Sequence, residues 1–427
     1  MIGGLTILPF RPNWVHGVTL RSTYATAQRI ESTGGSMTRT SERDHGQRQI
    51  KFTALLHEDF RRQWDAFREL NPPGTLLGIP LWSEEGIVLT APAASGALAL
   101  QVSSTANIDW RGEAVLVAQA SLPAFDLTVE GFEISSVTGN TINLGAGLAN
   151  AFNTGDEVLP LMRARQVADY AEMLHTPETS EIELTFDEDL SFMSAVQYST
   201  TPAYPTYLSL PVLPLIAEWS QSPKTFITKR THFVASGLNT QVLATLGNYV
   251  SQRIAHRVGM DGRTDRALLW QFFHDRKGRF SRFWLPSLKN ELKLAANAAP
   301  ADTTLQLANL AQFSSRYALG GDLHRAIFIT DGVNWWIRQV INLSGGTNRV
   351  TIDSPLGGAG VPAGGCQIGM LTLVQFAADD LEIELDAPVV ARADIAFNEL
   401  EKEYGEVVEA ESGDASGTRQ GQELIAA

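Results

Sequence analysis

Acidic side chains alternate with apolar ones in two short stretches of this sequence. Glu181, Glu183 and Asp187 follow this pattern around Ile182 and Leu184. The second stretch carries Asp380, Glu382, Glu384 and Asp386, with Ile383 and Leu385 between them. Alternate residues of a strand point to one face, so such carboxylates could bind Ca²⁺ or form the acid pair of a glycosidase. The pattern is also typical of the solvated face of an amphipathic edge strand, and we favour that simpler interpretation.

Other motifs that carry chemistry are missing from the sequence. It contains no phosphate-binding loop of the Gly-x-x-x-x-Gly-Lys type, no Gly-x-Ser-x-Gly elbow and no His-Glu-x-x-His zinc motif. The glycines between Gly357 and Gly365 precede neither a basic residue nor a helix, which favours a turn over a phosphate cradle. Cys366 is the one cysteine, so an intramolecular disulfide and a multi-cysteine zinc site are excluded. We therefore predict no catalytic residue, no metal and no cofactor.

Two adjacent tryptophans, Trp335 and Trp336, are candidates for a binding surface, and Trp110 is a third. Such rings can stack on sugars. Because neighbouring residues of a strand point to opposite faces, at most one of Trp335 and Trp336 can lie in a core. The other is left for a protein interface, which we favour, or for a glycan.

Bulk composition narrows the class of protein. With 44% hydrophobic and 19% charged residues, the chain of 427 residues can bury packed cores. Its formal net charge of −14 does not attract nucleic acid, so we expect no nucleic-acid sequence recognition. We expect no membrane span, because no stretch of about 20 apolar residues occurs. The opening residues lack a basic region and are interrupted by Pro9 and Pro12, which argues against a signal peptide and for synthesis in a cytoplasm.

An internal repeat is the strongest organisational signal. The pattern Asp59, Trp64, Phe67 recurs as Asp265, Trp270, Phe273 at one fixed spacing. The same spacing brings Pro80 onto Pro286, and Trp14 and Trp219 each follow a Leu-Pro pair at nearly the same spacing. The pattern of Glu181 to Leu184 also recurs as Glu382 to Leu385. Several matches in one order predict a tandem duplication.

Each copy is predicted to contain one short helix among strands. Asp59 and Asp265 stand where a helix N-cap is expected. Phe60, Trp64 and Phe67 follow at helical spacing, and we interpret this stripe as the face that packs on a sheet. Short alternating runs separated by Gly, Asn and Ser turns follow in both copies, which predicts a small all-β module inserted into each unit.

The predicted fold is mainly β, a tandem duplication of a β-sandwich or barrel unit with one short helix. The first repeat spans residues 1–205, with an inserted module at about 88–165. The second spans residues 206–405, with an inserted module at about 292–370. The prolines between Pro202 and Pro214 mark the boundary. Residues 406–427 are acidic and rich in Gly, Ser and Gln, and we expect a flexible tail.

Several short stretches resemble the distal tail and baseplate hub proteins of long-tailed bacteriophages. Leu8-Pro-Phe-Arg-Pro-Asn-Trp14, followed by Val18, is similar to the opening of these proteins, and the segment from Pro214 to Pro223 resembles the same opening. The stretch Gly34 to Arg43 resembles their Arg-containing segment, and Arg276 to Pro286 resembles their Gly-Arg…Phe-Trp-Leu-Pro stretch.

The resemblance implies a non-catalytic structural protein of the virion, located at the tail tip or baseplate. It implies a homo-oligomeric ring that joins the tail tube protein to the central hub, the fibres and the receptor-binding proteins. A trimer with pseudo-sixfold symmetry and a hexamer both fit a duplicated chain. Two alternatives remain open at this point: a carbohydrate- or receptor-binding adhesin that uses the inserted modules, and a glycan hydrolase that uses the acidic strands.

Overall fold

The computed structural model describes residues 5–30, 37–84, 86–117, 129–167, 170–198, 203–215, 218, 221–236, 240–287, 289–310, 325–358 and 360–400. Within these residues the fold is mainly β, as predicted, and most strand pairs are antiparallel. The predictions for Trp219, for Gly34 to Ser36 and for the tail 406–427 fall outside the described residues.

The first half holds one α-helix among short strands. Its elements are β1 (Thr6–Ile7), β2 (Val18–Thr23), β3 (Thr26–Ile30), β4 (Met37–Ser41), β5 (Gln47–His57), α1 (Asp59–Leu70), β6 (Leu76–Pro80), the 3₁₀ helix η1 (Trp82–Glu84), β7 (Ala99–Gln101), β8 (Glu113–Val117), β9 (Val129–Thr138), β10 (Thr141–Leu144), β11 (Glu157–Gln166), β12 (Ala171–Leu174), β13 (Thr179–Glu188) and η2 (Leu190–Phe192).

The second half follows the same order of strands around its own helix. Its elements are β14 (Thr206–Tyr207), β15 (Leu210–Pro211), β16 (Lys224–Ser236), β17 (Thr240–Asp261), α2 (Arg263–Arg276), β18 (Phe283–Pro286), β19 (Thr304–Gln306), β20 (Ala326–Thr330), β21 (Trp335–Ser344), η4 (Gly345–Thr347), β22 (Arg349–Ile352), β23 (Gln367–Phe376), β24 (Asp380–Ala387) and β25 (Val390–Glu399).

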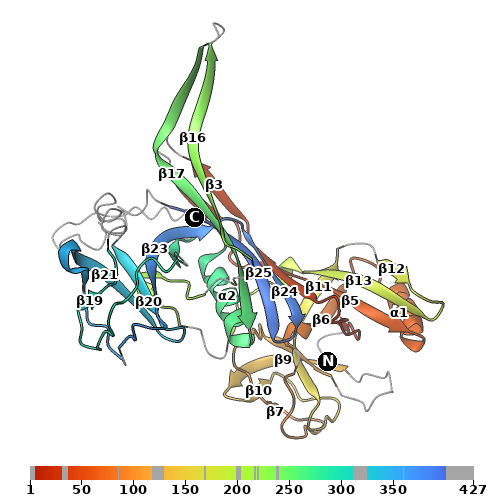
Figure 1. Cartoon of the computed structure of the whole chain (residues 1–427). Coiled ribbons are helices and arrows are strands. Elements are labelled where there is room, and N and C mark those ends of the chain that lie inside the picture. The colour runs from red at the N-terminus through yellow and green to blue at the C-terminus, as the bar shows by residue number, and fades with distance from the viewer. Residues whose placement is uncertain are drawn as a thin grey trace, which may run out of the picture.

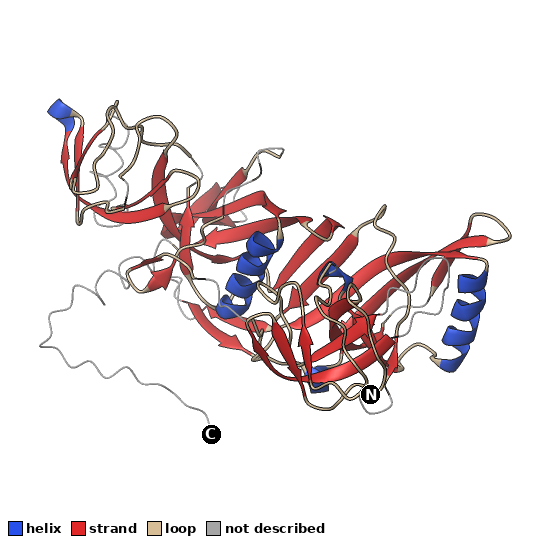
Figure 2. Cartoon of the chain, turned by 90° about the horizontal axis from the view of Figure 1, so that it is seen from below, coloured by secondary structure: helices blue, strands red, loops and turns tan. Residues whose placement is uncertain are grey.

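The two halves share one central ladder of strands. Its order is β16–β17–β25–β24–β2–β5–β13–β12, so the first four strands come from the second half and the last four from the first half. One face of the ladder is apolar: Ile182, Leu184 and Phe186 of β13 are buried, and the intervening residues are not. This alternation is the expected pattern of an antiparallel sheet with one face in water. Helices α1 and α2 lie at different places along the ladder, α2 near the middle of the molecule and α1 at one end (Figures 1 and 2).

Strand pairings in the first half recur in the second half with the same register. Strand β5 pairs with β13 as β17 pairs with β25, and β6 pairs with β11 as β18 pairs with β23. Phe186 is opposite Ile50, and Phe397 is opposite Ile254. Even the β-bulge between β9 and β10 has a counterpart between β21 and β22. These registers assign each residue of the ladder a counterpart in the other half.

One of the repeat matches predicted from the sequence is wrong. Glu181 to Leu184 lies in β13, whose counterpart is β25, whereas Glu382 to Leu385 lies in β24, whose counterpart is β12. The Glu-Ile-Glu-Leu pattern repeats because both strands have one buried and one solvated face, and that alternation is common to half-buried strands. It does not identify equivalent positions.

The helices begin differently from the prediction. Glu58, at φ 43°, precedes α1, and Gly262, at φ 104°, precedes α2, so neither Asp59 nor Asp265 is the N-cap. Neither of these two N-cap residues forms a side-chain capping hydrogen bond. The predicted packing stripe is confirmed, because Trp64, Trp270 and Phe273 are buried in the main core. Phe60 and Phe67 pack against that core while partly exposed.

Each half also carries a small β module with its own core. Leu100, Phe132 and Ile142 lie in the first module core, and Leu305, Val340 and Val350 in the second. Strand β11 connects the first module to its parent unit, since it pairs with β8 over Glu157 to Pro160 and with β6 over Leu161 to Arg165. Strand β23 does the same in the second half, pairing with β20 and β18. In Figure 1 both modules project away from the central ladder.

Candidate functional site

The two halves meet where β2 of the first half pairs with β24 of the second. We call this contact, together with helix α2 that packs beside it, the central interface. The register runs from Val18 opposite Leu385 to Thr23 opposite Asp380. Gly17, at φ 71°, lies just before β2, and a Cβ atom there would stand 2.6 Å from the carbonyl oxygen of Leu385. Glycine is therefore required for the two strands to approach at this point.

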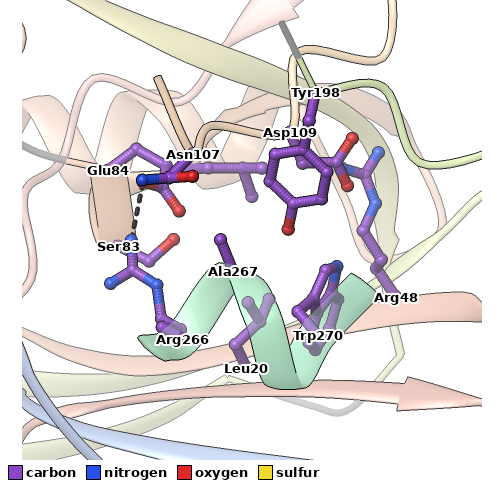
Figure 3. A pocket seen from close by; sticks show the side chains of 11 residues that line it. Leu20, Arg48, Ser83, Glu84, Asn107, Asp109, Tyr198, Arg266, Ala267 and Trp270 are labelled. Atoms are coloured by element: carbon purple, nitrogen blue, oxygen red, sulfur yellow. Dashed lines mark hydrogen bonds and ion pairs between the residues drawn. The ribbon is translucent and has the colours of Figure 1, made fainter. Parts of the chain in front are cut away.

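Helix α2 belongs to the second half but contacts the first. Its Arg266 donates to Glu84 of η1 across 2.6 Å and to the carbonyl oxygen of Pro388 across 2.9 Å. Arg263 of the same helix donates to the carbonyl oxygen of Glu84 across 3.2 Å. Figure 3 shows Arg266 and Glu84 facing each other. Both charges are buried, so each depends on the other for solvation.

A histidine on α2 completes a second contact between the halves. His274 Nε2 lies 3.4 Å from Arg111 Nη2, and its Nδ1 lies 2.8 Å from the hydroxyl of Tyr24. Arginine can only donate, so Nε2 accepts and the ring proton lies on Nδ1, which donates to Tyr24. Burial lowers the pKa of His274 well below its usual value, and the positive charges of Arg111 and Arg48 lower it further. The ring is therefore neutral in the folded protein.

Below the helix lies a buried ion pair within the first half. Arg48 of β5 donates to Glu188 of β13 across 2.5 Å, and Arg111 approaches the same carboxylate at 3.8 Å. Arg111 is also paired with Asp109 at 2.7 Å. Burial alone would raise the pKa of Glu188, but the charge of Arg48 and its hydrogen bond outweigh this effect and lower it. The cluster is thus ionised and fixes β5, β13 and the first module relative to α2.

A cavity lies among these residues, but it is small. Its volume is about 20 Å³, and it is lined by residues of both halves, among them Glu84, Asp109, Tyr198, Arg266 and Trp270 (Figure 3). A cavity of about 10–15 Å³ has room for one water molecule. The acidic and basic groups of the central interface therefore gather around space for water and not around space for a substrate.

The acidic strands lie on the solvated face of the ladder, as the simpler interpretation predicts. Glu183 pairs with Lys51 at 2.6 Å, and Glu384 pairs with Arg392 at 2.7 Å. A cavity of about 350 Å³ over β24 and β25 is lined by residues of both charges. Three of its four carboxylates, Asp380, Glu384 and Asp394, pair with Arg21, Arg392 and Arg257 respectively, and the fourth is Glu382.

The distance between the two halves disfavours a shared glycosidase site. Glu183 lies on β13 and Glu384 on β24, with β5 and β2 between them. Three strand spacings amount to about 14 Å. Paired glycosidase carboxylates stand about 5–9.5 Å apart. This geometry does not support a hydrolase site shared between Glu183 and Glu384.

The paired tryptophans are placed as the strand geometry requires. Trp336 is buried in the core of the second module. Trp335 faces the other way and packs 5.8 Å from the ring of Phe328, in a cluster that includes Val212 and Trp284. Trp110 is buried as well. Trp110 and Trp336 are thus closed to a sugar, and Trp335 is half-buried against its cluster.

A group of metal-type ligands lies at the surface where α1 begins. His57, Glu58 and Glu178 are all exposed, and their ligand atoms lie within 4.8 Å of one another. Exposed acidic groups often gather in this way without an ion. Cys366 is free and partly buried against the second module core, in line with its interpretation as a small hydrophobic residue.

The ends of the ladder are two strand edges without a partner among the described residues. Strand β12 pairs only with β13, and β16 pairs only with β17. Both edges carry exposed apolar side chains: Met173 and Leu174 are 62% and 61% exposed, and Phe226 and Ile227 are 51% and 69% exposed. An apolar strand edge left in water invites pairing with another chain.

Several of the predicted repeat residues lie in packed elements, whereas the residues of the central interface were not predicted. Pro80 and Pro286 end buried strands as expected, and Trp14 packs partly buried against the main core. Seven residues of this interface were not predicted from the sequence: Tyr24, Arg48, Glu84, Arg111, Glu188, Arg266 and His274. One signal was present: Arg48 continues the inward phase set by Ile50 and Phe52, so a buried arginine was foreseeable.

Comparison with known proteins does not place the chain in a family. No protein-family model matches the chain, and no curated protein is significantly similar to it. No helix in the described part of the chain is long and apolar enough to cross a membrane.

Proposed function

We propose that this chain is a non-catalytic structural protein of a bacteriophage tail tip or baseplate, and that it assembles into a ring. One observation carries the proposal. The two halves, with matching strand registers, are joined edge to edge through β2 and β24, while the counterpart edges, β12 and β16, have no partner among the described residues. A contact that joins unlike edges can repeat from chain to chain, and it closes into a ring when its rotation allows.

The arrangement favours three chains over six. A ring of six chains built from the first half alone would need the edge of β2, but β24 of the same chain occupies that edge. Three chains present six units, which matches the sixfold symmetry of a tail tube and the threefold symmetry of a central spike implied by the resemblance. The matching registers support the predicted duplication as the origin of the two halves.

The partners follow from this placement in the virion. The ring joins the tail tube protein to the central hub, and the modules, which project from the ladder in Figure 1, dock fibre and receptor-binding proteins. Two charged clusters among the described residues support architecture over catalysis: one surrounds room for a single water, and in the other Glu183 and Glu384 are ion-paired on a solvated face.

Light scattering on the purified chain, combined with negative-stain images, tests the proposal. We expect closed rings with three times the 46.5 kDa mass of one chain. A chain that stays monomeric at high concentration, or one that forms only compact dimers, contradicts it. Open filaments would mean that the contact repeats without closing, which contradicts the ring as well.

A further inference from the structure

We infer that β12 of one copy pairs in antiparallel fashion with β16 of the next copy, in the register that β24 and β2 use within the chain. This inference rests on the proposed function and names the contact that closes the ring. The partner is a second copy of this chain. The interface already seen between β2 and β24 supplies the template, because β12 is the counterpart of β24 and β16 is the counterpart of β2.

The register can be transferred residue by residue on the β12 side. Leu174 pairs with Ser180 of β13, and Leu385 pairs with Ala391 of β25. Strands β13 and β25 are equally long and begin at Thr179 and Val390, so Ser180 and Ala391 are equivalent. Leu174 is therefore the counterpart of Leu385, and it follows that Met173 and Ala171 are the counterparts of Glu384 and Glu382.

The β16 side follows in the same way. Arg21 of β2 pairs with Gln49, and Phe226 of β16 pairs with Arg253. Gln49 and Arg253 are equivalent, because the next residues, Ile50 and Ile254, face Phe186 and Phe397. Phe226 is therefore the counterpart of Arg21, and Lys224 is the counterpart of Thr19.

Within the chain, Arg21 is opposite Glu382 and Thr19 is opposite Glu384. Between copies, the same register places Phe226 opposite Ala171 and Lys224 opposite Met173. Arg21 and Glu382 of the internal contact are thus replaced between copies by the apolar pair Phe226 and Ala171, and Glu384 is replaced by Met173 opposite Lys224. Phe226 and Met173 then lie diagonally across the two strands, within reach of an aromatic ring. Coordinated differences on β12 and β16 relative to β24 and β2 are expected if β12 and β16 pair.

The helices give independent support. Helix α2 buries seven of its 14 residues, among them Ala267, Trp270 and His274, because the first half covers its second side. Helix α1 has Trp64 as its one buried side chain among those described, and Leu70 at its end is 81% exposed. Figure 1 places α1 at the end of the molecule, beside β12 and β13. A neighbouring copy on the β12 edge would cover α1 as the first half covers α2.

Disulfide trapping tests the register. In a Cys366→Ser background, we combine Met173→Cys with Lys224→Cys, whose Cα atoms in an antiparallel pair stand about 4.5–5.5 Å apart, within disulfide range. Oxidation is expected to give covalent species of two and three chains and nothing larger, because a closed ring has no free end. The matched control combines Leu174→Cys with Lys224→Cys, which face opposite sides of the sheet and should not link.

A second variant tests the contact without covalent chemistry. Phe226→Asp places a charge on an exposed residue, so the fold is retained while ring formation weakens by tenfold or more. Val333→Asp alters an apolar residue that is 84% exposed in the second module and should leave the ring intact.

The outcomes separate this inference from the proposed function. The β12–β16 contact is contradicted if the Phe226→Asp variant still forms rings and the Met173→Cys, Lys224→Cys variant forms no disulfide. The proposal that the chain forms a ring would then still hold. Monomers under all conditions overturn both.

Discussion

Arg266 and Glu84 form an ion pair of 2.6 Å between the two halves of the chain, and both residues are more than 90% buried. Arg266 lies on helix α2 of the second half, and Glu84 ends the 3₁₀ helix η1 of the first half. This pair and the strand contact between β2 and β24 hold the halves in one arrangement, although the residues involved are far apart in the sequence.

Breaking this pair from one side should destabilise the protein strongly. Arg266→Ala leaves the Glu84 carboxylate buried with one nearby cation, Arg263, at 3.7 Å. Removing one partner of a buried pair costs about 3–5 kcal/mol of unfolding free energy. The matched control is Arg392→Ala, because Arg392 pairs with Glu384 in an exposed position and should cost at most about 1 kcal/mol. Urea denaturation of both variants measures the difference, and equal losses would contradict a special role for Arg266.

The close approach of β2 and β24 makes a second prediction. In Gly17→Ala the new methyl group meets the Leu385 carbonyl oxygen at 2.6 Å, and the residue must also hold φ 71°. Gly74→Ala serves as the control, since Gly74 has φ 90° with nothing within 4 Å of a Cβ atom. Backbone strain alone costs about 1–2 kcal/mol at each site. We expect a larger loss at Gly17, measured by thermal unfolding, and similar losses at both sites would show that the strands separate without cost.

Local features of the fold were predictable because they depend on neighbours in the sequence. The Trp64 stripe repeats at helical spacing, and β13 alternates apolar and polar residues. The helix starts were mispredicted because Glu58 and Gly262, at positive φ, begin the helices without a side-chain cap. Capping by Asp59 or Asp265 would have required the chain to enter the helix later.

The central interface was not predictable because strand pairing between distant segments leaves no local signature. Val18 and Leu385 look like ordinary strand residues, and neither stretch contains a signal that identifies the other as its pairing partner. His274 and Arg111 read as surface residues of a helix and a turn until the fold brings them together. The burial of Glu188 was predictable from the alternation in β13, because Glu188 continues the inward phase of Leu184 and Phe186.

A buried histidine in β17 makes the protein sensitive to acid. Neither ring nitrogen of His256 has a hydrogen-bond partner in the described protein, and burial lowers its pKa from 6.5 to about 4. A lowered pKa means that the unfolded chain takes up the proton first. This contribution to stability is therefore complete above pH 6.5 and is lost as the pH falls through about 4, with a total of about 3 kcal/mol.

The other half suggests the substitution that removes this sensitivity. The counterpart of His256 is Phe52, which lies 6.3 Å from Phe186 at an interplanar angle of 34°, while His256 lies 5.3 Å from Phe397 at the same angle. We expect His256→Phe to unfold at a higher denaturant concentration at pH 7 and to lose less stability between pH 6.5 and 4. Chemical denaturation across this pH range measures both effects, and a steeper acid loss in the variant would contradict the assignment.

Substitutions at Tyr24 and at His274 distinguish the loss of a hydrogen bond from the loss of a titrating group. Tyr24→Phe removes the acceptor of the Nδ1 proton and should cost about 1–3 kcal/mol at every pH, because it leaves a buried donor unpaired. His274→Gln keeps polar groups beside Tyr24 and Arg111 but has no proton to gain. Since the pKa of His274 is lowered in the fold, its contribution is present above about pH 6.5 and is lost in acid. Denaturation at one fixed protein concentration should therefore show a flatter acid decline for His274→Gln and an unchanged slope for Tyr24→Phe. Equal slopes in the wild type and in His274→Gln would mean that His274 does not couple the two halves to pH.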